Sequence, residues 1–305
     1  MDEVLLIFST RPSRRKAGTT AVAEALALLG DLGASAPTGG PLAEQAGIFW
    51  ISLPPDSIDA AQARLPRLGY TEAVDSLELL PRKRRSRKGK VGEEIFWHGQ
   101  LYKLKRLYQE DAQAMREMAP DRRTFAYSTT NGEVRQIRGY RGGGDPLTRR
   151  GLPVCDARLL VNLVYSAEST IFLDPFGGVG GIILEAYESG YQVVSCDRDS
   201  ALRYGLKDLG DLHCVANAAR LPISSRSISA IATEPPYHPE ADTAVISSLK
   251  EMYRVLKKGG RVSMLCAYRQ VEGIKKTAAY LGLLLKHDAS IDRKNLACAI
   301  LVFEK

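Results

Sequence analysis

The sequence predicts an α/β fold, with a mainly parallel sheet in residues 150–305 and a smaller α+β domain before it. Residues 171–186 lead from an apolar stretch through a glycine-rich loop into a helical pattern, which is how a nucleotide-binding β-α unit begins. Four further strand-like stretches follow, and two adjacent ones come after them. We therefore expect five parallel strands and a terminal antiparallel pair.

The chain of 305 residues is long enough for two domains of ordinary size. It has no run of the roughly 18 apolar residues that a membrane span needs, and its start lacks the pattern of a secretory signal. The five cysteines are far apart and form no Cys-x-x-Cys pair, which argues against a zinc site or a disulfide framework. These features predict a cytoplasmic protein with no membrane contact and no bound metal.

The net charge of +7 equals the charge of one segment, residues 82–90, which holds seven basic residues and no acidic one. Such a segment is either a solvated linker or an arm that contacts the phosphates of a nucleic acid without reading its sequence. We expect the second, with phosphate contacts from Arg82, Lys83, Arg84, Arg85, Arg87 and Lys88.

Residues 1–80 are predicted to form the smaller α+β domain. Its strands are expected at 4–8, 47–53 and 72–80, and its helices at 17–30 and 56–68. This β-α-β-α-β order is consistent with a small ferredoxin-like domain. We find no catalytic constellation in this stretch of sequence, so we expect the domain to recognise the substrate or to support the fold.

Residues 81–149 are predicted to connect the two domains and to bind RNA. Leucines and methionines every three or four residues predict a helix over 100–118 with a buried apolar face. Asn131-Gly132 between extended stretches predicts a hairpin. Basic and aromatic side chains beside it suit phosphate contact and base stacking, although ordinary surfaces carry such mixtures too. The candidates are Arg135, Arg138 and Arg141.

The glycine-rich loop follows Asp174, where the first strand of the larger domain is expected to end, and a helix over 155–164 precedes that strand. The loop lacks the Lys-Ser/Thr pair of a P-loop and the spacing of the dinucleotide fingerprint. Residues 174–181, Asp-Pro-Phe-Gly-Gly-Val-Gly-Gly, instead resemble the first motif of methyltransferases that bind S-adenosylmethionine (SAM). That resemblance implies that the loop's cofactor-binding residues are Asp174, Phe176, Gly177, Gly178 and Gly180.

The next two strands, at 191–196 and 212–215, are expected to carry further cofactor contacts. Asp197 lies about 20 residues after the glycines, where a carboxylate can accept hydrogen bonds from both ribose hydroxyls. Methyltransferases of this type usually have an acidic residue at the position of Asn217, next to Ala218, where it accepts from the adenine amine. The side-chain carbonyl oxygen of Asn217 can accept in the same way.

The strand at 228–233 leads into Glu234-Pro235-Pro236-Tyr237, which resembles the Asp/Asn-Pro-Pro-Tyr motif of methyltransferases that act on planar nitrogens. An acceptor at the strand end and a carbonyl fixed by the prolines can hold both N–H groups of an amine and turn its lone pair toward the methyl donor. The tyrosine offers a stacking face to a flipped base. The extra methylene of Glu234 moves the carboxylate by roughly 1.5 Å, so the pocket is either reshaped or weakened.

Helices at 242–257 and 271–282, a strand at 261–266 and the pair at 283–291 and 296–303 complete the predicted sheet. The sequences at 174–186, 217–222 and 233–237 make residues 150–305 similar to the tRNA guanine-N2 methyltransferase family. The resemblance implies a Rossmann-like fold, SAM as the cofactor and a tRNA guanine amine as the methyl acceptor, presented by Glu234 to Tyr237. It covers the first 150 residues poorly, so the modified nucleotide stays open.

Three alternatives remain from the sequence. A DNA adenine-N6 methyltransferase shares the Pro-Pro-Tyr chemistry, although we see no insert for target recognition. A protein-glutamine methyltransferase is disfavoured by the basic segment. An RNA-binding protein that keeps the fold without catalysis is the non-enzymatic alternative, and Glu234 is the observation in its favour.

Overall fold

The computed structural model of the protein describes residues 3–43, 45–80, 94–111, 124–128, 134–138, 152–168, 170–202, 210–293 and 296–305. Of 124–128 and 134–138 it describes the backbone. Residue contacts divide the chain into two compact units, 1–112 and 113–305. None of the described helices is long and apolar enough to cross a lipid bilayer.

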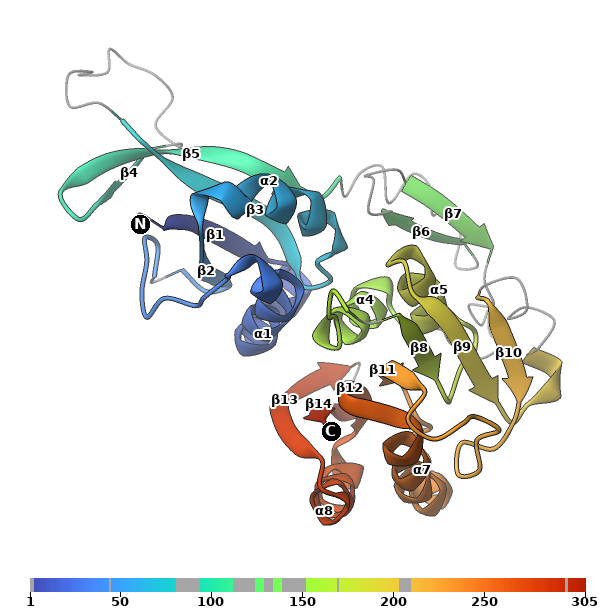
Figure 1. Ribbon diagram of the computed structural model, residues 1–305. Helices are drawn as coiled ribbons and strands as arrows, with labels where there is room; N and C mark the ends of the chain where they lie inside the picture. Colours follow the sequence, from blue (N-terminus) through green and yellow to red (C-terminus); the bar gives the residue numbers. More distant parts are fainter. Residues whose placement is uncertain are drawn as a thin grey trace. The chain divides into compact units, whose positions relative to one another are not determined.

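The first unit is built on an antiparallel sheet of five strands in the order β2-β1-β3-β5-β4 (Figure 1). The strands are β1 (Val4–Thr10), β2 (Ile48–Leu53), β3 (Thr71–Leu79), β4 (Glu94–Trp97) and β5 (Gln100–Gln109). The helices are α1 (Gly18–Leu29) and α2 (Ile58–Arg64), with 3-10 turns at Pro12–Ala17, Gly30–Leu32, Pro55–Ser57 and Leu65–Arg67. The β-α-β-α-β order predicted for residues 1–80 is confirmed.

Helix α1 shows how the apolar pattern positions these elements. Ala21, Ala25 and Leu28 recur every three or four residues, and each is fully buried. The helix joins β1 to β2, which are antiparallel neighbours. The α+β class is therefore confirmed. The connection from β1 through α1 to β2 joins antiparallel neighbours, which differs from the split β-α-β unit of a ferredoxin-like domain.

The helix predicted over residues 100–118 is wrong for its described part, because residues 100–109 form the strand β5. Leu101, Leu104 and Leu107 fit a helical spacing. However, β5 pairs with β3 on one side and with β4 on the other, and these ladders satisfy its backbone hydrogen bonds. Residues 112–118 lie outside the described part of the chain.

The second unit begins with a two-stranded antiparallel hairpin, β6 (Thr124–Ser128) and β7 (Val134–Arg138). This pairing confirms the hairpin that Asn131-Gly132 predicts, although the connecting residues 129–133 lie outside the described residues.

A sheet of seven strands follows, in the order β10-β9-β8-β11-β12-β14-β13. Neighbours from β10 to β12 are parallel, whereas β14 is antiparallel to both β12 and β13. The predicted five parallel strands and terminal pair are therefore confirmed. The strands are β8 (Ile171–Asp174), β9 (Gln192–Asp197), β10 (Leu212–Val215), β11 (Ile228–Thr233), β12 (Leu256–Ala267), β13 (Leu284–Arg293) and β14 (Leu296–Glu304).

Helices cover both faces of this sheet (Figure 1). The helices α4 (Val154–Leu163) and α5 (Gly181–Glu188) lie on one face, and α7 (Asp242–Val255) and α8 (Val271–Leu281) lie on the other. Leu249, Met252 and Ile274 of α7 and α8 are fully buried in the core that they share with the central strands. Further 3-10 turns are Ser200–Leu202, Pro239–Ala241 and Tyr268–Gln270.

Strand β8 lies between β9 and β11. After β8 the chain adds β9 and β10 on one side, and it then crosses to the other side to add β11 and β12. In open α/β sheets, ligands bind outside the carboxyl ends of the strands at such a switch point. The sheet order therefore places the ligand site at the carboxyl ends of β8, β9 and β11.

Candidate active site

Three predicted carboxylates lie at this edge of the sheet. Asp174 is the last residue of β8, Asp197 is the last residue of β9, and Glu234 directly follows β11. Because β8 pairs with both β9 and β11, the three residues come from adjacent strand ends. Carboxylates in this arrangement can accept hydrogen bonds from the hydroxyl and amino groups of a ligand.

The glycine-rich loop turns tightly between β8 and α5. Gly178 (φ 51°) and Gly180 (φ 87°) have left-handed backbone angles, which residues with a Cβ adopt only at a cost. The N–H of Gly177 donates to the carbonyl of Cys196 over 2.8 Å, and the N–H of Gly178 donates to Asp197 Oδ2 over 2.9 Å. The loop is therefore held against the end of β9.

Asp174 is almost fully buried, with 1% of its surface exposed. Its Oδ1 accepts from Thr233 Oγ1 over 2.7 Å and from the N–H of Phe176 over 3.1 Å, which connects the end of β8 to the end of β11. Burial raises the pKa of this carboxyl to about 7, although both hydrogen bonds oppose that effect. Asp174 therefore changes its charge near neutral pH, and a cation placed beside it would favour the ionised form.

Asp197 and Asn217 have polar atoms left for a ligand. Asp197 is partly exposed and receives one backbone N–H on each oxygen, from Gly178 on Oδ2 and from Asp199 on Oδ1 at 2.9 Å. The described residues therefore leave each carboxylate oxygen a lone pair for a ligand. Asn217 is exposed, and its Oδ1 accepts from the N–H of Ala219 over 2.9 Å. Ala218, which follows Asn217 in the chain, is buried.

The corner after β11 is held by three polar side chains. Tyr237 Oη donates to Glu234 Oε1 over 2.5 Å. Arg293 Nη1 donates to the same oxygen over 2.5 Å and to Tyr237 Oη over 3.0 Å. Burial and the Glu234 carboxylate raise the pKa of the Tyr237 phenol, so this hydroxyl stays protonated and donates. Glu234 Oε2 accepts no hydrogen bond from the described residues, which leaves it available to a ligand.

The backbone carbonyls of this corner are of two kinds. The carbonyl of Pro236 accepts from Gln270 Nε2 over 3.1 Å, and the carbonyl of Tyr237 accepts from Arg269. The carbonyl of Pro235, in contrast, accepts no hydrogen bond from the part of the chain that the structure describes. The corner therefore offers a ligand two acceptors, this carbonyl and one carboxylate oxygen of Glu234.

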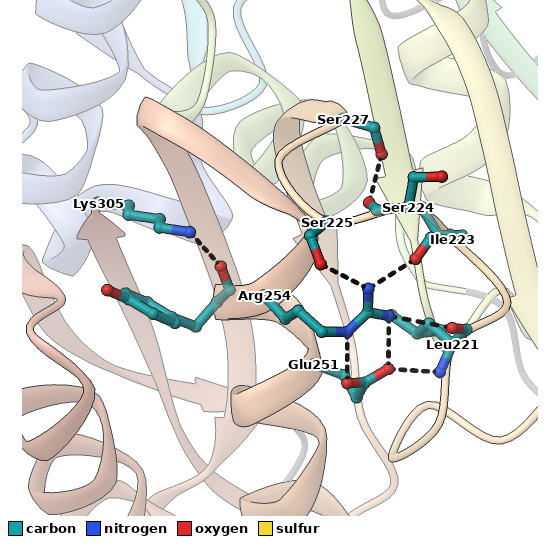
Figure 2. Close-up of polar contacts among 9 residues, drawn as sticks. Leu221, Ile223, Ser224, Ser225, Ser227, Glu251, Arg254 and Lys305 are labelled. Carbon is teal, nitrogen blue, oxygen red and sulfur yellow. Dashed lines mark hydrogen bonds and ion pairs between the residues drawn. The ribbon is translucent and has the colours of Figure 1, made fainter.

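The segment after Asn217 is attached to α7 through Arg254, as Figure 2 shows. The guanidinium donates to the carbonyls of Leu221 (3.1 Å) and Ile223 (2.7 Å) and to both carboxylate oxygens of Glu251. Glu251 in turn accepts from the N–H of Leu221 over 2.7 Å. This network fixes the chain a few residues beyond Asn217 and thereby restricts where Asn217 lies.

The predicted nucleic-acid contacts are described only in part. Arg135 and Arg138 lie on β7, for which the structure gives the backbone. The described residues contain no group of three or more His, Cys, Asp or Glu side chains that could hold a metal ion. The remaining candidates, Arg82, Lys83, Arg84, Arg85, Arg87, Lys88 and Arg141, lie outside the described residues.

Sequence reasoning misses three side chains of the corner, namely Arg269, Gln270 and Arg293. Gln270 is 34 residues from the carbonyl that it contacts, and Arg293 is 59 residues from Glu234. One sequence signal could have found them. Like Asp174 and Asp197, these three side chains lie at or just beyond the carboxyl ends of strands, where ligands bind in open α/β sheets.

No family model matches the chain. A curated tRNA (guanine(10)-N2)-dimethyltransferase of Methanothermobacter thermautotrophicus is 34% identical over 125 residues, covering 35% of this chain and 36% of the relative. The protein of the same name from Methanocaldococcus jannaschii is 34% identical over 95 residues, covering 27% of each chain. The matched region thus spans about a third or less of the length of these relatives.

The crystal structure of TrmN from Thermus thermophilus matches with a TM-score of 0.51, at 16% identity and with 99% of both chains covered. This likeness supports the fold assignment. The chain therefore has the fold of SAM-dependent methyltransferases, and over part of its length it is homologous to these two tRNA (guanine(10)-N2)-dimethyltransferases.

Proposed function

We propose that the protein is a SAM-dependent methyltransferase that acts on the exocyclic amine of a nucleic-acid base, guanine N2 in tRNA. The observation that carries this proposal is the pair of acceptors at the corner after β11, the Pro235 carbonyl and Glu234 Oε2. A primary amine has two N–H groups, so two fixed acceptors can hold it with its lone pair directed at the methyl donor. A partner with one N–H would leave one acceptor unsatisfied.

The residues at the ends of β8 and β9 fit SAM. The free lone pairs of Asp197 suit the ribose hydroxyls, and the Asn217 amide beside Ala218 suits the adenine. Among the described residues, a Cβ placed on Gly178 would meet only the Phe176 carbonyl, at 3.7 Å, so the described part of the chain leaves this side of the loop open to a ligand. The methionine ammonium would favour the ionised form of Asp174, which then provides the opposite charge. When bound, SAM supplies an electrophilic methyl group.

In this proposal the chain contributes alignment more than acid–base chemistry. Tyr237 provides a stacking face for the base, and its hydroxyl is fixed by Glu234 and Arg293. Gln270 and Arg269 hold the two carbonyls after Pro235, so the corner is rigid before the base arrives. Such positioning can supply a large part of a rate enhancement in a transfer between two bound groups.

The tRNA assignment rests on the names of the partial homologues and on the basic residues of the chain. We propose that 81–149 is the RNA-contacting region between residues 1–80 and the methyltransferase domain 150–305. Its contacts would come from the segment 82–90 and from Arg135, Arg138 and Arg141. We expect the protein to act in the cytoplasm.

The test is methyl transfer from labelled SAM to unmodified bulk tRNA, with the product nucleosides identified by mass. We expect N2-methylguanosine with the wild type and its loss with Glu234→Ala, because one of the two amine acceptors is then missing. Glu234→Asp shows whether the longer side chain is required. If the protein instead forms N6-methyladenine in DNA, or methylates a protein, the methyl acceptor proposed here is wrong. SAM binding without transfer to any of these would indicate a binding protein.

A further inference from the structure

Arg293 contacts the proposed amine-binding corner from a distant part of the chain. It is the last residue of β13, and its side chain is 19% exposed. One guanidinium nitrogen donates to Glu234 Oε1 and to Tyr237 Oη. A second nitrogen of the guanidinium, Nε, lies 3.6 Å from Oδ2 of Asp156 in α4. Three elements therefore meet at this side chain.

Arg293 is the cation of this cluster and faces two carboxyl groups, Glu234 and Asp156. Burial alone would lower the pKa of Arg293, but the neighbouring Glu234 and Asp156 carboxyl groups raise it, so the guanidinium stays charged. An arginine in this position cannot lose its proton and presents fixed donors. The Glu234 carboxylate therefore faces a permanent cation on one side.

We propose that Arg293 is a positioning residue for methyl transfer, which rests on the function proposed above. A glutamate carries its carboxylate roughly 1.5 Å farther from the backbone than an aspartate. Arg293 and Tyr237 bind Oε1 and thereby fix the direction of this longer side chain. Only Oε2 then remains to accept the amine N–H. Arg293 is what allows a glutamate to replace the shorter acceptor.

This role has a consequence that a purely structural ion pair would not have. If Arg293 positions Glu234, its importance depends on which residue stands at 234. An asparagine at 234 is neutral and shorter, so it can neither pair with the guanidinium charge nor require its orientation. The effect of removing Arg293 should therefore be large with Glu234 and small with asparagine.

The experiment measures kcat and KM for tRNA methylation with Arg293→Gln, Arg293→Lys, Glu234→Asn and the double variant Glu234→Asn/Arg293→Gln. Misplacement of the acceptor by about 1 Å should lower kcat about 100-fold in Arg293→Gln. The SAM dissociation constant should stay within about twofold, and Arg293→Lys should recover part of the rate, since it keeps the charge. In the asparagine background, Arg293→Gln should change kcat less than about threefold.

Arg261→Gln is the matched control. It removes another partly exposed arginine–glutamate pair, Arg261–Glu304 at 3.0 Å, which joins the middle of β12 to the end of β14, six residues before the carboxyl end of β12. Its kcat should equal that of the wild type. An equal loss of kcat in both backgrounds, or an unchanged kcat in Arg293→Gln, would overturn the positioning role alone. A wild type that transfers no methyl group to a base would overturn the proposed function and this role together.

Discussion

The buried carboxyl of Asp174 gives a prediction with a definite sign. Its pKa of about 7 in the folded chain lies well above the ordinary value of 3.8, because burial disfavours the charged form. Between these two values the folded state binds more protons than the unfolded state, so stability falls as the pH rises through this window. At 1.36 kcal/mol per pKa unit, the ionised form costs at most about 4 kcal/mol above pH 7.

Replacing Asp174 by asparagine removes this cost. The amide oxygen still accepts from Thr233 Oγ1 and from the Phe176 N–H, and it is neutral at every pH. We expect Asp174→Asn to raise the free energy of unfolding by about 1–4 kcal/mol at pH 8, and by nearly nothing at pH 4, where the wild-type group is protonated. The assay is urea denaturation of the SAM-free protein at pH 4, 6 and 8.

The control is Asp31→Asn, because Asp31 is partly exposed and hydrogen-bonded to Arg64, which lowers its pKa. Asp31→Asn should destabilise slightly above pH 4, opposite in sign to Asp174→Asn. An Asp174→Asn variant that is no more stable than the wild type at pH 8 would refute the argument, since the native carboxylate would then be ionised without cost. If Asp174 faces the SAM ammonium, wild-type affinity for SAM should also rise through about pH 7, and the variant should lack this rise.

Three further predictions concern other parts of the site. Arg254→Met should cost about 1–2 kcal/mol of stability by chemical denaturation and weaken SAM binding in calorimetry, because the segment after Asn217 loses its attachment to α7. Gly178→Ala should cost about 1–2 kcal/mol because of its left-handed backbone, whereas Gly39→Ala, with open space around it, should leave the melting temperature unchanged. Replacing Arg82, Arg84 and Arg85 by glutamine should make tRNA binding less salt-dependent. The slope of log K against log salt concentration should become shallower by about 0.7–0.9 for each phosphate contact removed.

The parts of the fold that could be predicted from sequence are those with strong local signals. Short apolar runs ended by Asp174 and Glu234, with glycines or prolines after them, identify β8, β11 and the loops that follow. The strand β5 fails the same approach, since its leucines also fit a helix and only pairing with β3 decides between the two.

The contacts of the corner could not be predicted because they depend on sheet order. Arg293 reaches Glu234 only because β13 follows β14 and β12 in the sheet, although the residues are 59 positions apart in the chain. Likewise, the burial that raises the pKa of Asp174 depends on how β8 packs between β9 and β11. Neither is visible in the residues next to them.

The hydrogen bond between Arg293 and Glu234 also bears on how such a site can change during evolution. If a chain with Asn or Asp after β11 acquired Glu before the arginine, its carboxylate would be misdirected. If a chain with the Glu–Arg pair lost the arginine first, a half-buried anion would be left without its cation. The two positions should therefore be exchanged together. Related chains with Glu at 234 are expected to have arginine at 293, and those with Asn are expected to accept many residues there.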